Sequence, residues 1–331
     1  MNLPPEWDDE EYTDYEECGL YDKEDYYMDK YIIGHSEIEL DTKENVDLPY
    51  VRTIPATRIV LCMSKIAHLI HNGELTGGKR EWTEDDGTEI SVVLQAAKMP
   101  VDLSAFDMAV YAAIASLYDC DIHEFSIMAV CRTLCLNPKM TRVGGKLRDA
   151  VQASVEKMSG IKAEIRWEPL GQQGEEHEGS FLGLSMFRGR TDNGHCCSFW
   201  RFTAPPMLYQ YSLNRGECWR MPIKVLGTGN VVVNNIEAVL LRYCLLRRIA
   251  IICRLAKPQR ETANRIAYRS LSKEVGLNMQ SEANRKKMRN AIRKCFKCWK
   301  RAGLIVEYSD YKKHKEIIGI EIQVERRTKG R

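Results

Sequence analysis

The spacing of apolar residues changes twice along this chain from a helical period to an alternating one, and this repeated change leaves few folds open. Over residues 100–190, three segments with apolar residues three or four positions apart precede two alternating segments. Over residues 235–325 the same order returns, without clear sequence identity to the first. A helix buries one stripe and a strand one face, so three helices and a hairpin can enclose a core together. The chain is therefore predicted to be α+β, with two such units in tandem.

The first unit is predicted over residues 100–230. Ser104 and Ser126 are suited to cap its first two helices, and Gly160 is suited to end the third. The expected elements are helices over 103–118, 125–136 and 141–160, and strands over 161–169 and 180–190 joined by a polar loop over 171–179. The apolar face of the third helix is expected to comprise Val143, Leu147, Val151, Ser154 and Met158. Mixed strand and loop are expected up to residue 230.

Residues 46–99 are predicted to lead into this unit. Residues 58–75 have helical spacing, so a helix is expected there. Residues 80–95 alternate around Asp86-Gly87, a dipeptide typical of tight turns, so a β-hairpin is expected.

The second unit is predicted over residues 231–331. Asn235 is suited to cap its first helix, and Gly303 is suited to end its last. The expected elements are helices over 236–257, 270–277 and 281–302, and strands over 304–311 and 316–325. Three helices followed by a hairpin is the element order of a winged helix. The fold is therefore predicted as two tandem winged-helix domains.

The last predicted helix, residues 281–302, has apolar and basic residues on opposite faces. The apolar face comprises Met288, Ala291, Ile292, Cys295, Trp299 and Ala302. The other face comprises Lys286, Lys287, Arg289, Asn290, Arg293, Lys294, Lys297, Lys300 and Arg301. Residues 236–331 contain 25 Lys/Arg against 9 Asp/Glu, so the unit as a whole is strongly basic. Like charges four residues apart repel, so such a face costs stability unless an anion binds it.

Double-stranded DNA supplies dense phosphate, and its major groove accepts an α-helix. The N-terminal residues of such a helix reach base edges, where Asn pairs with adenine and Arg with guanine, while Lys mainly contacts phosphate. The DNA-contacting residues predicted in the second unit are Asn284, Arg285, Lys286, Arg289, Asn290, Arg293, Lys294, Lys297, Lys312, Lys313 and Lys315. A basic surface without a specific ligand is the plainer alternative. The helix face and the hairpin tip agree in sign and position, which favours DNA.

The third helix of the first unit is more neutral. It offers Arg142, Lys146 and Arg148, but Asp149 and Glu156 reduce the local charge. This unit is expected either to contact DNA through the three basic residues or to form a dimer surface, and the sequence leaves both open.

Residues 1–45 contain 16 Asp/Glu against 3 Lys, with many tyrosines and few aliphatic residues. This composition predicts a disordered acidic arm. It could act as a solubilising tail or could attract a basic surface, either of this chain or of a partner.

Sequence patterns for catalysis, metals and membranes are weak. No phosphate-binding Gly-rich motif ending in Gly-Lys-Ser/Thr occurs, and no His-hydrophobic-His pair accompanies a tyrosine. His68 and His71, or Cys295 and Cys298, would supply only half of a metal site, and core packing is the favoured reading of these cysteines. The 12 scattered cysteines and the absence of a signal peptide favour a reducing cytoplasm, and arginines interrupt the most apolar stretch. We expect no enzyme activity, no cofactor, no metal and no membrane span.

The paired units resemble plasmid replication initiator proteins. The resemblance covers roughly residues 100–331 and rests on segments such as LSAFDMAVYAAIASLY and RKKMRNAIRKCFKCWKRAGLIVEY. It implies cytoplasmic binding to double-stranded repeats at an origin, local strand opening and recruitment of host replication proteins. It also implies a homodimer through the first unit in some states. A winged-helix transcriptional regulator is the main alternative, and a DNA-nicking replication enzyme is a second.

Overall fold

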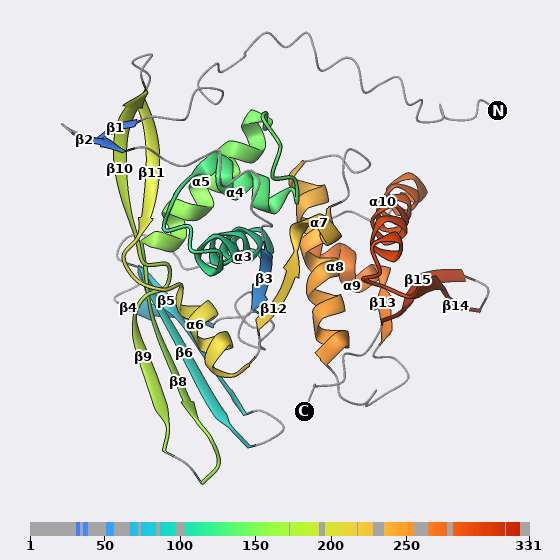
Figure 1. The fold of residues 1–331 in the computed structure, drawn as a ribbon. Helices are drawn as coiled ribbons and strands as arrows, with labels where there is room; N and C mark the ends of the chain where they lie inside the picture. The colour runs from blue at the N-terminus through green and yellow to red at the C-terminus, as the bar shows by residue number, and fades with distance from the viewer. Residues whose placement is uncertain are drawn as a thin grey trace, which may run out of the picture.

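This computed structural model describes residues 31–33, 36–38, 51–55, 67–71, 74–83, 87–96, 103–171, 173–191, 196–216, 218–227, 235–254, 264–276, 281–314 and 316–324. Helices and antiparallel strands alternate through these residues, which confirms the α+β class (Figure 1). None of the described helices is both long and apolar enough to cross a membrane.

The first part of the molecule is built around helix α3 (Ala105–Asp119), which is buried from Asp107 to Leu117. Its alanines, Ala105, Ala109, Ala112, Ala113 and Ala115, fall within one half of its circumference, so neighbouring elements can approach that side closely. Ser104 caps its N-terminus in a capping box with Asp107, as predicted for Ser104. Helices α4 (Ile127–Leu134) and α5 (Gly145–Ser159) pack on α3, with Ser126 as the predicted cap of α4.

Beside these helices lies a five-stranded antiparallel sheet in the order β4-β5-β6-β8-β9. Its strands are β4 (Ala67–His71), β5 (Glu74–Thr83), β6 (Glu89–Ala96), β8 (Ile161–Glu168) and β9 (Glu175–Ser180). The predicted hairpin around Gly87 is confirmed as β5–β6, and Gly87 has the positive φ of 82° that the turn requires. Alternate residues of β6 and β8 face the core, including Val92 and Ile165.

Two predictions in this region are wrong. The second half of the helix expected over 58–75 is strand β4 and the start of β5, because pairing with a neighbouring strand overrides the local helical spacing; residues 58–66 lie outside the described residues. Strand β8 pairs with β6 and with β9, and β9 occupies most of the loop expected over 171–179. β9 is polar because it is an edge strand with one side open to solvent.

The segment expected to pair with β8 instead belongs to a second sheet, of order β2-β1-β10-β11-β7. Its strands are β1 (Tyr31–Ile33), β2 (Ser36–Ile38), β7 (Glu124–Ser126), β10 (Leu184–Thr191) and β11 (Cys196–Phe202). Six residues of the predicted acidic arm therefore form short strands at its edge. The other residues of that arm lie outside the described ones, so their predicted disorder stays a prediction.

Smaller elements complete the first part of the chain. Strand β3 (Val51–Pro55) pairs with β12 (Cys218–Pro222), helix α6 (Met207–Asn214) lies before β12, and α7 (Ile223–Leu226) follows it. Helix α6 was not predicted from the sequence. A polar cluster ties these elements to α3, because Asp119 accepts hydrogen bonds from Thr53 and Tyr209 and pairs with Arg220.

The C-terminal part has the element order helix, strand, helix, helix, strand, strand. These are α8 (Ile236–Arg254), β13 (Arg265–Ala267), α9 (Tyr268–Val275), α10 (Glu282–Arg301), β14 (Glu307–Lys313) and β15 (Glu316–Gln323). Asn235 caps α8 as predicted, by accepting a hydrogen bond from the backbone N–H of Ala238. The three strands form an antiparallel sheet in the order β13-β15-β14.

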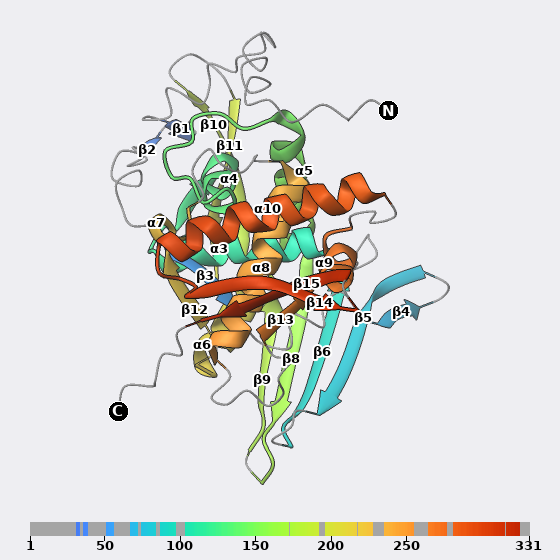
Figure 2. The same cartoon turned by 90° about the vertical axis from the view of Figure 1, so that its right-hand side faces the viewer.

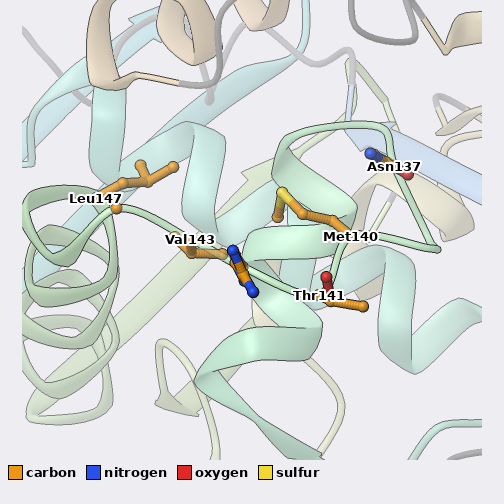
Figure 3. Close-up of a pocket in the computed structure, with 7 residues that line it drawn as sticks. Asn137, Met140, Thr141, Val143 and Leu147 are labelled. Atoms are coloured by element: carbon orange, nitrogen blue, oxygen red, sulfur yellow. The ribbon is translucent and has the colours of Figure 1, made fainter. Parts of the chain in front are cut away.

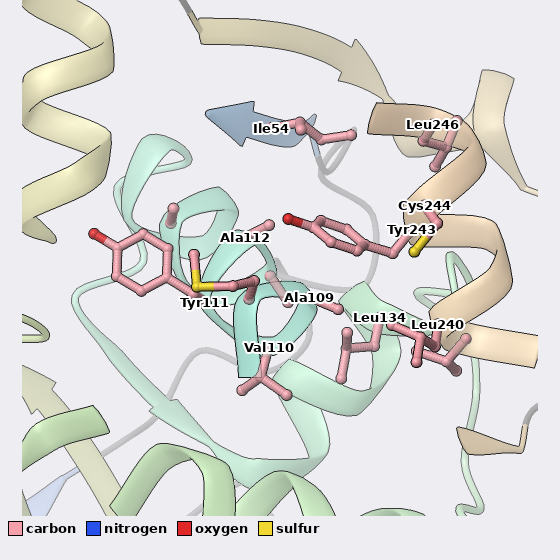
Figure 4. Close-up of a cluster of buried hydrophobic side chains, with 14 of the residues drawn as sticks. Ile54, Ala109, Val110, Tyr111, Ala112, Leu134, Leu240, Tyr243, Cys244 and Leu246 are labelled. Atoms are coloured by element: carbon pink, nitrogen blue, oxygen red, sulfur yellow. The ribbon is translucent and has the colours of Figure 1, made fainter. Parts of the chain in front are cut away.

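Helix α8 joins the two parts of the molecule. Its apolar residues Leu240, Tyr243 and Leu246 pack with α3 and with Ile54 of β3, within one continuous cluster of buried side chains (Figure 4). Trp299 of α10 adds a polar link, because its indole N–H donates to the carbonyl of Leu226, 2.8 Å away.

Candidate nucleic-acid interface

The sequence of α10 fixes where the helix begins, which face it buries and where it ends. Ser281 caps its start by accepting a hydrogen bond from the backbone N–H of Asn284 at 3.1 Å. Gly303 has a φ of 74°, which lets the chain leave the helix. The buried face comprises Met288, Ile292, Cys295, Phe296 and Trp299. Sequence reasoning missed Phe296, whose helical angle lies at the edge of the apolar stripe.

Helix α10 lies across one face of the molecule, beside the β14–β15 hairpin (Figure 2). The ring of Phe296 packs edge-on against Tyr308 of β14, with ring centroids 5.5 Å apart. The helix and the hairpin therefore present one continuous surface.

Four cations on the flank of α10 are paired with carboxylates. Glu282 accepts hydrogen bonds from Arg285 and Arg289, at 2.8 and 2.6 Å. From β14, Asp310 pairs with Arg293 and Glu307 pairs with Lys300. The cations of α10 that are paired with these carboxylates are therefore Arg285, Arg289, Arg293 and Lys300. The predicted single-sign surface is thus partly compensated on the side that faces the hairpin.

Two of these pairs shift the pKa of one member in the direction that stabilises its charge. The hydrogen bond to Asp310 raises the pKa of the Arg293 guanidinium above its ordinary value. The hydrogen bond from Lys300 lowers the pKa of Glu307, with help from the backbone N–H of Tyr308. Arg293 and Glu307 are therefore charged at neutral pH.

The outward crest of α10 carries the cations that these acids do not reach. At 100° per residue, Lys286, Asn290, Lys294, Lys297 and Arg301 project opposite the buried face. All five are exposed, and among the described residues none of the four cations has an acidic partner. Helix α10 contains nine Lys/Arg and one Asp/Glu, so it remains strongly basic even with Glu307 and Asp310 beside it. We call these five residues the crest.

Beyond the crest, the surface continues at both ends of the hairpin. Lys297, Lys300 and Arg301 line an open hollow of about 730 Å³ with Glu307 and Tyr308. At the tip of β14–β15, Lys312 and Lys313 are exposed, and His314 adopts a φ of 48° in the turn. Lys315 lies outside the described residues.

The predicted site of the first unit occupies a different part of the molecule. Arg142 lies just before α5, and Lys146 and Arg148 lie in its first turn. Helix α5 packs on α3 and α4, whereas α10 packs on α7 and α8. Figure 1 shows α5 and α10 on opposite sides of α7 and α8. Arg142 lines a hollow of about 280 Å³ with Thr141, Val143 and other residues at the α4–α5 turn (Figure 3). The structure therefore does not bring the two predicted sets together.

The histidine and cysteine pairs that the sequence offered as partial metal sites occupy ordinary structural positions. His68 and His71 belong to strand β4, so the helix that would have placed them on one face is absent there. Cys295 is fully buried in the core face of α10, and burial raises the pKa of its thiol to about 12. Within the described part of the chain, no three His, Cys, Asp or Glu residues are grouped as a metal site would need.

The chain matches no protein-family model, and no curated protein sequence matches it. Two solved structures, both of domains 2 and 3 of RctB, have a distantly similar backbone. The first has a TM-score of 0.40 and 10% identity, and the match covers 82% of this chain and 98% of that one. The second has a TM-score of 0.41 and 12% identity, with coverage of 80% and 96%. A likeness of this degree does not establish a shared activity.

Proposed function

We propose that residues 236–323 form a winged helix that binds double-stranded DNA at a specific sequence. Helix α10 would enter the major groove as the recognition helix, and the β14–β15 hairpin would lie on the backbone as the wing. The support is the element order from α8 to β15 and the sheet order β13-β15-β14.

The observation that carries the proposal is the crest. Its four cations without acidic partners lie on the helix face most open to a ligand, and Asn290 lies among them. Phosphate contacts from such a row supply affinity, and the asparagine amide can pair with adenine. The crest therefore fits a duplex better than it fits a small anion.

For the whole chain we propose a replication initiator that acts at origin repeats and promotes local strand opening. This step rests on the sequence resemblance given above. In this proposal the protein opens the strands by bending or untwisting the duplex as it binds, and it carries out no chemical step. The first unit, through Arg142, Lys146 and Arg148, would add a second DNA contact or a dimer surface, and host replication proteins would be recruited.

The crest can be tested by replacing Lys286, Lys294 and Lys297 together by alanine. Each lysine that neutralises a phosphate contributes close to one unit to the slope of log K against log salt. We expect the slope to fall by about 2 to 3 units and binding to weaken at least tenfold, measured by fluorescence anisotropy with a labelled duplex.

The control for this triple variant is Lys162→Ala, which removes an exposed lysine from strand β8 of the sheet. It should leave affinity and slope unchanged. A triple variant with wild-type slope would remove the crest from the interface, and equal losses in the control would indicate a nonspecific charge effect.

Replication initiation needs a separate test. A replicon-free plasmid that carries only this gene and its flanking repeats should be maintained in a suitable host. Failure of maintenance together with specific DNA binding would favour the transcriptional regulator. A nicked product from supercoiled DNA and a divalent metal would instead favour the nicking enzyme.

A further inference from the structure

Three arginines of α10 are each bound by a carboxylate, unlike the crest lysines. Glu282 binds Arg285 through one carboxylate oxygen and Arg289 through the other, at 2.8 and 2.6 Å. Asp310 binds the Nη2 of Arg293 through both oxygens, at 2.9 and 2.7 Å. In contrast, Lys286 and Lys294 of the crest have no acidic partner among the described residues.

A carboxylate that pairs with an arginine has two separate effects. It cancels a charge, which weakens attraction to phosphate, and it fixes the plane of the guanidinium. A guanidinium has five N–H donors, so one that is bound to a carboxylate at one edge keeps donors for a second, planar partner. The O6 and N7 acceptors of guanine in the major groove form such a partner.

The location of the pairs suits base reading more than phosphate binding. Arg285 and Arg289 lie in the first half of α10, the part of a recognition helix that contacts base edges. Arg293 is held from the neighbouring strand, so its position is defined by β14 as well as by its own helix. Arg289 is the most enclosed of the three, with 22% of its side chain exposed.

We propose that Glu282 and Asp310 are positioning residues, which orient Arg289 and Arg293 to read guanine while the crest lysines contact phosphate. This inference rests on the proposed DNA binding, and it assigns separate residues to specificity and to affinity. Glu282 also lies in the first turn of α10, where a negative charge stabilises a helix. That second effect acts on stability and does not alter the choice of base.

The test compares three variants that remove the same single charge: Glu282→Gln, Asp310→Asn and Glu307→Gln. Glu307 is the matched control, because it pairs with Lys300 at the opposite end of the helix. Each protein selects from a pool of duplexes with a randomised core, and its affinity is then measured for the best wild-type duplex and for a scrambled one. Thermal melts confirm that the variants are folded.

Positioning predicts a divergence among the three variants. Glu282→Gln and Asp310→Asn should reduce the preference for the selected duplex by about tenfold or more, with loss of preference at guanine positions. Glu307→Gln should tighten binding to both duplexes and keep the preference. Arg289→Lys keeps the charge without the planar fork, so it should keep affinity for the scrambled duplex and lose the preference.

Uniform tightening in all three variants with unchanged base preference would overturn the positioning role and leave the proposed DNA binding intact. A wild-type protein that enriches no sequence would overturn the inference. A wild-type protein that binds no duplex at low salt would overturn the proposed function as well.

Discussion

At the scale of single residues, Arg52 stands out because its charge is buried without a carboxylate. It is fully buried on β3, its Nη1 donates long hydrogen bonds to the carbonyls of Thr133 and Leu134, and its Nε and Nη2 have no hydrogen-bond partner among the described residues. Burial lowers the pKa of Arg52 to about 10, a net value that already includes the opposing effect of Tyr243 and the smaller, lowering effect of Arg242. A buried, poorly compensated cation is costly.

Arg52→Met should therefore stabilise the protein. The folded state binds the Arg52 proton less tightly than the unfolded chain, so the penalty is present in full below pH 10, which includes neutral pH. We expect the free energy of unfolding at pH 7 to rise by about 1 to 3 kcal/mol, measured by urea titration.

A loss of stability in Arg52→Met would contradict this prediction. A loss of more than about 2 kcal/mol would show that the contact with the carboxyl end of α4 outweighs the desolvation penalty. Arg132→Met is the control, because Arg132 is only partly buried and its Nε bonds a single carbonyl, that of Met140, at 2.8 Å.

At the scale of elements, the sequence predicted correctly the features that depend only on neighbouring residues, such as helix caps. The predicted caps Ser104, Ser126 and Asn235 all start helices, because each requires only a side chain and the next turn of backbone. Strand β9 was missed because it pairs at a sheet edge, where no apolar alternation is needed. Strand β4 was read as a helix because its pairing with β5 is not visible in its own residues.

In the candidate site, too, local features could be predicted from the sequence and contacts between elements could not. The basic face of α10 and the hairpin beside it could be predicted from spacing and composition. The carboxylates that pair with its arginines could not, since Asp310 reaches Arg293 only after β14 has folded beside the helix. Glu282 was visible in the sequence, but its two oxygens serve two arginines only in the geometry of the first turns.

The attachment of α10 to α7 can be tested with Trp299→Phe. Phenylalanine keeps most of the buried ring but cannot donate to the carbonyl of Leu226. We expect the free energy of unfolding to fall by about 1 to 3 kcal/mol, since the carbonyl loses its partner and a small void forms. Calorimetry would measure the loss, with the half-buried Trp219→Phe as the control. An unchanged melting temperature would mean that the hydrogen bond has no net effect on stability.

At the scale of the whole molecule, charge is divided between the two ends of the chain. Residues 1–30 contain 12 Asp/Glu and 2 Lys, whereas α10 contains nine Lys/Arg. An acidic segment on the same chain competes with phosphate for a basic surface at a high effective concentration. The net charge of +2 therefore combines a short acidic N-terminal segment with a basic remainder.

Removal of residues 1–30 tests this competition and keeps strands β1 and β2. We expect the truncated protein to bind a duplex of random sequence several-fold more tightly at low salt, with the difference vanishing at high salt. A chain in which a Gly/Ser segment of equal length replaces residues 1–30 separates charge from bulk. If both variants bound like the full chain, the acidic segment would have no part in DNA affinity.

Helix α3 has a practical consequence for anyone who studies the protein in cells. Ala109, Ala112 and Ala113 have at most 1% of their surface exposed, with neighbours closing in from every side. Replacing such a buried methyl by the isopropyl group of valine overfills the core, and overfilled cores typically lose about 1 to 3 kcal/mol. Substitutions such as Ala113→Val are therefore the natural source of heat-sensitive alleles, which would leave the surface of α10 untouched and switch the protein off by warming the culture.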